Sequence, residues 1–140
     1  MRRRVIVDAG PLVALFDKDA GEHRRVLDYF RNLNGQLLST VVVIAEVIYV
    51  LDFSHKAQQD FLKWAFRGAI KLVDLTDDDG EHIIGLHAKY ADCPMDFADA
   101  TLVAIADRLG VCEVATLDGD FRIYRYRQRQ TFDLPLLELS

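Results

Sequence analysis

Short apolar runs alternate with longer segments in which apolar and polar residues follow a helical period. The apolar runs are four to eight residues long, which is the usual length of a buried strand. They predict strands at 4–8, 36–39, 70–75, 112–117 and 132–139. These strands are separated by helical patterns, so most of them are expected to run parallel in one sheet.

In most of the chain between these runs, apolar residues recur at the spacing of a helix. Asn34-Gly35 and Gly110 are stop signals, whereas Thr40, Thr76 and Asp96 have the side chains preferred at helix starts. A turn at 9–11 is followed by a helical turn up to Phe16, and longer helices are predicted at 22–33, 40–53, 56–67, 76–90 and 96–109. The sequence therefore predicts an α/β fold of three layers, with a mostly parallel sheet between helices.

Four carboxylates occur in apolar surroundings. Asp8 ends a strand run, Glu46 lies among apolar helix residues, Asp99 shares a helix face with Leu102, and Asp118 follows another strand run. Burying an isolated carboxylate is unfavourable, and buried acids are usually paired or bound to a metal. Because ligands in open α/β sheets bind at the carboxyl ends of strands, the four acids are expected to form one metal site.

Each acid also has an ordinary structural explanation. Asp8 and Asp118 precede turn sequences, and Asp96 and Asp99 are favourable in the first turn of a helix. Glu46 could face solvent, although a helix with so many apolar neighbours would then have a poor polar face. The metal-site hypothesis therefore depends on the acids occurring together.

Composition narrows the class of protein. A chain of 140 residues with 51% hydrophobic residues is expected to form one globular domain over 1–140. The net charge of −5 does not suggest a nucleic-acid-binding protein, but an acidic metal site would account for much of it. Two cysteines without metal-ligand spacing, and the absence of a membrane span or signal-peptide pattern, predict a cytoplasmic protein.

Known catalytic and nucleotide-binding motifs are absent, including GxGxxG, GxxxxGK[ST], HExxH and GxSxG. One stretch near the end interleaves arginine with tyrosine, a combination that can bind phosphate and stack on bases. Its arginines are Arg122, Arg125, Arg127 and Arg129. A solvated loop explains this stretch equally well.

Taken in order, four motifs resemble those of the PIN domain, a family of metal-dependent ribonucleases that includes the VapC-type toxins of toxin–antitoxin pairs. The motifs are 5–12 with Asp8, 39–47 with Glu46, 95–106 with Asp99, and 114–121 with Asp118. The resemblance extends over nearly the whole chain, because the motifs are spread from its start to near its end.

The resemblance implies a PIN-like fold with about five strands and a Mg²⁺ or Mn²⁺ site made by those four acids. It also implies that Asp96 is an auxiliary ligand and that Thr40 and Thr116 orient the carboxylates. The expected activity is RNA hydrolysis by water. The expected assembly is a homodimer that binds a small antitoxin protein and has no association with a membrane.

Two other functions are compatible with the sequence. A receiver-like signalling domain also places acids around Mg²⁺, but Asp8 has no acidic neighbour and Asp118 is followed by arginines with no lysine. A catalytically silent PIN-like domain that binds RNA or protein is the second alternative. The presence of all four acids favours the enzyme.

Overall fold

A computed structural model describes residues 2–127 and 129–138 of the chain. A parallel sheet forms the centre of the molecule. Its strands are β1 (Arg3–Val7), β2 (Gly35–Ser39), β3 (Ile70–Leu72) and β4 (Val114–Ala115), in the spatial order β3-β2-β1-β4. All three pairings are parallel, and Ile6 of β1 lies opposite both Leu38 and Val114. The predicted α/β class is confirmed, with four strands in the sheet instead of about five.

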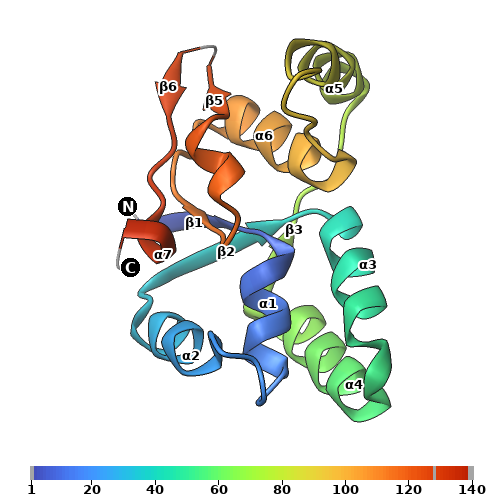
Figure 1. Ribbon diagram of the computed structural model, residues 1–140, viewed down its shortest axis with the longest axis vertical. Coiled ribbons are helices and arrows are strands. Elements are labelled where there is room, and N and C mark those ends of the chain that lie inside the picture. Colours follow the sequence, from blue (N-terminus) through green and yellow to red (C-terminus); the bar gives the residue numbers. More distant parts are fainter. Residues whose placement is uncertain (1, 128, 139–140) are drawn as a thin grey trace.

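Helices cover both faces of this sheet. They are α1 (Ala9–Phe16), α2 (His23–Asn32), α3 (Val41–Val50), α4 (His55–Trp64), α5 (Asp77–Lys89), α6 (Phe97–Leu109) and α7 (Pro135–Glu138). Shorter helical segments are η1 (Leu51–Phe53), η2 (Ala65–Ala69) and η3 (Gly119–Arg122). Figure 1 shows α1 to α4 on one side of the sheet and α5 and α6 on the other, so the predicted three layers are present.

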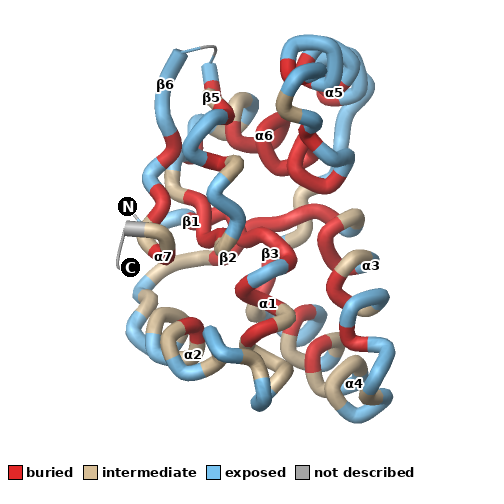
Figure 2. The backbone as a smooth tube through the Cα atoms, in the orientation of Figure 1, coloured by how far each residue is buried: buried red, intermediate tan, exposed pale blue. Residues whose placement is uncertain are grey.

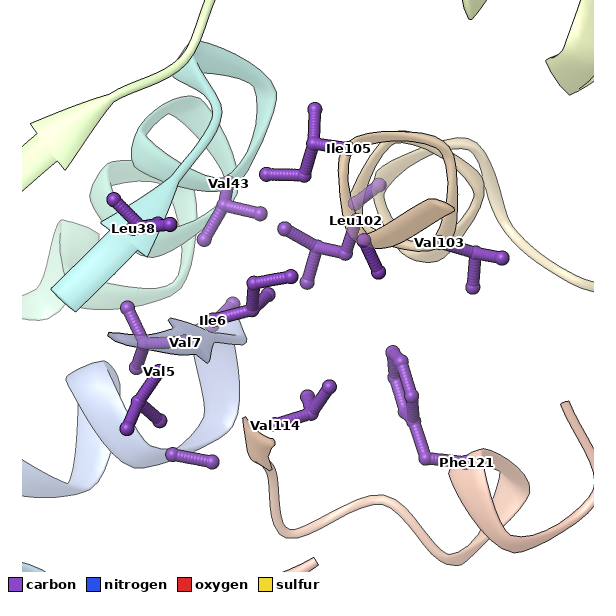
Figure 3. Close-up of a cluster of buried hydrophobic side chains, with 14 of the residues drawn as sticks. Val5, Ile6, Val7, Leu38, Val43, Leu102, Val103, Ile105, Val114 and Phe121 are labelled. Atoms are coloured by element: carbon purple, nitrogen blue, oxygen red, sulfur yellow. The ribbon is translucent and has the colours of Figure 1, made fainter. Parts of the chain in front are cut away.

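The core forms where β1 meets α6. Val5, Ile6 and Val7 have no exposed surface, as expected for a central parallel strand that is buried on both faces. Figure 3 shows Ile6 beside Leu102 of α6. Every residue of α6 from Ala98 to Ala106 is buried, and Figure 2 shows this helix as a continuously buried part of the chain.

The helix starts follow from local side-chain chemistry. The Asp96 side chain caps α6 and the Thr76 side chain caps α5, as predicted from their residue types. Asp79 completes a capping box with Thr76, which was not predicted from the sequence. Helix α6 ends at Gly110, whose φ of 69° is a left-handed conformation that glycine adopts without strain. These caps fix the position at which α6 begins and therefore the position of its acidic first turn.

Of the last strand predicted at 132–139, only one parallel bridge between Asp133 and Glu113 is present in the described residues. A short β6 (Gln130–Thr131) pairs with β5 (Arg125–Tyr126) in an antiparallel hairpin, and α7 follows from Pro135. Proline lacks an N–H for a strand ladder and has the φ angle of a first helical position, which explains the helix. Leu139 lies outside the described residues.

Two other predicted strands are shorter than expected. The strand predicted at 70–75 ends at Leu72, and the one predicted at 112–117 is limited to Val114 and Ala115. Within the described ranges, no helix has the length and apolar character needed to cross a membrane.

Candidate functional site

The predicted acids line one pocket of about 390 Å³ at the carboxyl edge of the sheet. Its acidic side chains are Asp8, Glu46, Asp96, Asp99 and Asp118, and the rest of the lining is Ala9, Gly10, Val13, Val50 and Leu117. These acids come from four separate parts of the sequence, and folding brings them together. None of the lining residues carries a positive charge.

Asp8 is fixed by hydrogen bonds at both carboxylate oxygens. It follows β1 directly, and its Oδ1 accepts a hydrogen bond of 2.8 Å from the N–H of Ala9 at the start of α1. The Thr116 hydroxyl donates to Oδ2 at 2.8 Å and accepts from the N–H of Asp118 at 3.0 Å. Thr116 therefore connects the acids that follow β1 and β4, in the orienting position expected from the sequence.

The Thr116 hydroxyl should contribute measurably to stability. Thr116→Val keeps the shape of the side chain but leaves a buried carboxylate oxygen and a backbone N–H without this partner. We expect the free energy of unfolding to fall by about 1–3 kcal/mol, measured by urea denaturation. The control is Thr131→Val at an exposed position of β6, which should leave stability nearly unchanged; equal losses in both variants would contradict the prediction.

Helix α6 supplies two acids to the pocket from its first turn. Asp96 caps the helix by accepting a hydrogen bond of 2.8 Å from the N–H of Asp99. Asp99 follows Asp96 by three residues, and it is only 5% exposed. The hydroxyl of Tyr124 lies 3.4 Å from its Oδ2 as a hydrogen-bond donor. The sequence left open whether the Arg–Tyr stretch stacks on bases or is a solvated loop, but Tyr124 in this stretch is completely buried.

Glu46 reaches the pocket from α3. The helix packs Val43, Ile44 and Val47 into the core, which leaves Glu46 half-buried at the edge of that face. Val50, one turn later, also lines the pocket. Glu46 therefore faces the other acids instead of bulk solvent.

Burial and mutual repulsion raise the pKa values of three acids in the pocket. The pKa of Asp99 is raised to about 8, first by burial and then by the charges of Asp8, Asp96, Asp118 and Glu46. Burial also raises the pKa of Asp8, although hydrogen bonds from Thr116 and Ala9 oppose the change. The pKa of Glu46 is raised by burial and by Asp96 and Asp8. This pocket is a place where a cation would be stabilised.

The donor atoms suit a hard divalent ion. Carboxylate oxygens favour Mg²⁺ or Mn²⁺, and no histidine or cysteine lines the pocket to favour a softer metal. Across residues 2–127 and 129–138, no three His, Cys, Asp or Glu side chains are placed to hold a metal ion as they stand. Coordination would therefore require the acids to turn toward a common point, and without a cation their repulsion opposes that movement.

Thr40 lies away from the carboxylates. Its hydroxyl is 2.9 Å from the hydroxyl of Thr101 on α6 and makes no capping hydrogen bond to α3. The pair is buried and connects the start of α3 to α6. Thr40 can therefore affect Glu46 and Asp99 only through the placement of their helices.

The four arginines of the Arg–Tyr stretch have different surroundings. Arg125 donates from Nη1 to the carbonyls of Arg122, Ile123 and Tyr124 at 2.8–3.0 Å. The guanidinium of Arg127 packs over Gly110, at the end of α6. Among the described residues, the side chains of Arg122 and Arg129 have no hydrogen-bond or ion-pair partner, and both residues are exposed. These two are the arginines most available to a ligand.

The sequence model of the PIN domain matches residues 5–125. A search of curated proteins found no match.

Solved toxin structures share the fold. VapC20 of Mycobacterium tuberculosis, described as a sarcin–ricin-loop-cleaving toxin, superposes with a TM-score of 0.80 and 18% identity, over 90% of this chain and 98% of that one. The VapBC2 structure from Rickettsia felis, bound to a promoter DNA fragment, has a TM-score of 0.63 and 15% identity, over 94% and 96%. A toxin–antitoxin complex from Klebsiella pneumoniae has a TM-score of 0.60 and 19% identity, over 84% and 89%.

Proposed function

Because the chain belongs to the PIN-domain family, we propose that it is a divalent-metal-dependent ribonuclease and the toxin of a toxin–antitoxin pair. The observation that carries this proposal is the pocket itself, in which five carboxylates converge with no basic residue. The family match leaves the receiver-like alternative without support.

Asp8, Glu46, Asp99 and Asp118 would hold the ion, and Asp96 would assist from the rim. A bound Mg²⁺ or Mn²⁺ would polarise a phosphate oxygen and lower the pKa of a water molecule. Asp8 is already oriented by Thr116 and by the N–H of Ala9, so little of its freedom remains to be lost on binding. Hydrolysis by water would give a 5′-phosphate and a 3′-hydroxyl, and no side chain has to act as a covalent nucleophile.

The proposed substrate is RNA. The most similar of the toxins described above cleaves the sarcin–ricin loop, which makes structured RNA the first substrate to test. An acidic pocket repels phosphate, so cations must approach the backbone from its surroundings. Arg122 and Arg129 are exposed and are our candidates for that role, whereas Arg125 and Arg127 have structural contacts of their own.

Metal binding can be tested without any substrate. A ligand that binds only the folded state stabilises it, by about 2.7 kcal/mol when its concentration is 100 times its dissociation constant. Saturating Mn²⁺ should therefore raise the melting temperature of the purified protein, and EDTA should reverse the increase. The same measurement with Ca²⁺, which has the same charge but a different size, tests the effect of ion size on the melting temperature.

Ribonuclease activity is tested on structured RNA with Mg²⁺, Mn²⁺ or EDTA. We expect cleavage with either ion, no cleavage with EDTA, and 5′-phosphate ends on the products. Thermal stabilisation by Mn²⁺ without cleavage would favour the silent RNA- or protein-binding alternative. No stabilisation by any divalent ion would contradict the proposed site.

A further inference from the structure

Tyr124 lies directly behind the pocket, on the side of Asp99 that faces the core. Its side chain is one of the largest with no exposed surface. The hydroxyl points at Oδ2 of Asp99, at a distance of 3.4 Å. A phenol on the solvent side could belong to a substrate site, but a completely buried one can act only on its protein neighbours.

Aromatic rings hold Tyr124 in place. The ring of Tyr90 meets it edge-on with centroids 5.2 Å apart, and the ring of Phe121 does so at 5.1 Å. The phenol of Tyr90 also accepts a hydrogen bond of 3.1 Å from the N–H of Arg125. Contacts of this kind leave the Tyr124 ring little freedom to move.

The backbone around Tyr124 is fixed as well. The Arg125 guanidinium donates to three successive carbonyls, from Arg122 to Tyr124. This explains part of the Arg–Tyr stretch without RNA, because one of its arginines closes the turn and one of its tyrosines fills the space behind the pocket. The hydroxyl is therefore held in place as a donor to Oδ2 of Asp99.

We propose that Tyr124 is a positioning residue that holds Oδ2 of Asp99 by a hydrogen bond and so would leave Oδ1 for a divalent ion. This inference rests on the proposed function, because it assumes that Asp99 is a ligand. The distance of 3.4 Å is long for a hydrogen bond between oxygens. Such contacts commonly shorten when a ligand assembles the site, and a small rotation of Asp99 would be enough.

Hydrogen-bond partners of metal ligands typically change metal affinity by about 10–100-fold when they are removed. Tyr124 would act on Asp99 by donating to one carboxylate oxygen, as the Thr116 hydroxyl donates to Oδ2 of Asp8. The two most buried acids of the pocket would then each have one dedicated hydroxyl donor.

The test is Tyr124→Phe, which removes the hydroxyl and keeps the ring. Mn²⁺ affinity of the purified variant is measured by calorimetry, and the melting temperature is measured in EDTA. We expect Mn²⁺ to bind about tenfold more weakly. The melting temperature without metal should change by no more than about 2–4 °C. The control is Tyr126→Phe, a buried tyrosine of β5 that does not line the pocket, and its Mn²⁺ affinity should equal that of the wild type.

Unchanged Mn²⁺ affinity in Tyr124→Phe would overturn the inference, even if the variant melted at a lower temperature, because that combination is the result of a purely structural hydroxyl. An equal loss of affinity in Tyr126→Phe would also overturn it. If the wild type bound no Mn²⁺, the proposed function itself would fail, and this inference would fail with it.

Discussion

Asp99→Asn should reduce RNA cleavage by about a thousandfold while the protein stays folded. The amide has nearly the shape of the carboxylate but is a much weaker ligand, and metal ions typically contribute several kcal/mol to the stabilisation of the transition state. The measurement is the single-turnover cleavage rate at saturating Mn²⁺. Asp96→Asn is the matched comparison on the same helix: asparagine also caps helices well, so a smaller loss is expected.

When metal is absent, the stability of Asp99→Asn should depend less on pH than the stability of the wild type. The pKa of Asp99 is raised from 3.8 to about 8, so between these values the folded protein holds a proton that the unfolded chain has released. Stability therefore falls as pH rises through this range and levels off above pH 8. The amide of the variant does not titrate, so the decline should be smaller there, although Asp8 and Glu46 will still contribute some of it.

Melting temperatures in EDTA at pH 5 and pH 8.5 provide the test. At the higher pH the variant should equal or exceed the wild type, since it lacks one of the repelling charges. Asp52→Asn, at an exposed position of η1 outside the pocket, is the control and should follow the wild type at both values. If the Asp99 variant were less stable than the wild type at pH 8.5, Asp99 would have a structural role that outweighs the repulsion.

The acids of the pocket could be predicted because they occur together, although each local signal alone also fits an ordinary structural role. Asp8 and Asp118 follow apolar strand runs, and in a parallel sheet such positions share one edge. Asp96 and Asp99 follow from helix capping, which places both in the first turn of α6. Glu46 was predicted from the apolar character of its neighbours, and it does face the pocket.

Other features depend on tertiary contacts that no local pattern contains. The sequence around Tyr124 does not indicate whether its side chain is exposed or buried. Only its packing against Tyr90 and Phe121 places it behind Asp99. Thr40 has the right residue type for a cap, yet it bonds to Thr101, which is 61 positions away. The last strand was mispredicted because its apolar residues fit a helix as well as a strand, and Pro135 decided between them.

Expression of this chain alone should stop cell growth, and co-expression of the small protein encoded beside it should restore growth. An unrestrained ribonuclease is harmful, so a toxin requires a partner that blocks its site. A pocket lined by five acids and no base is best blocked by an Arg or Lys of that partner. Asp8→Ala, which removes one proposed ligand, should abolish growth arrest at equal expression.

The partner should also cover the apolar side of α3 next to this pocket. Val41 and Tyr49 are 64% and 78% exposed, and Phe53 in η1 is 63% exposed. Tyr49 lies eight positions after Val41 on α3, and Phe53 lies four positions after Tyr49 in η1. Together they form an exposed apolar stripe on the segment that carries Glu46 and Val50 of the pocket. An amphipathic helix with a basic residue at one end would bury this stripe and place its cation among the acids.

A variant can separate docking on α3 from toxicity. Tyr49→Glu adds a charge to the stripe without removing a pocket acid, so the protein should still arrest growth but should respond less to its partner. Ile84→Glu, at a position of α5 that is 64% exposed, is the matched control and should be neutralised as well as the wild type. Full rescue of Tyr49→Glu would mean that the partner docks elsewhere. If the wild type caused no growth defect despite cleaving RNA in vitro, the protein would be a nuclease without a toxin role.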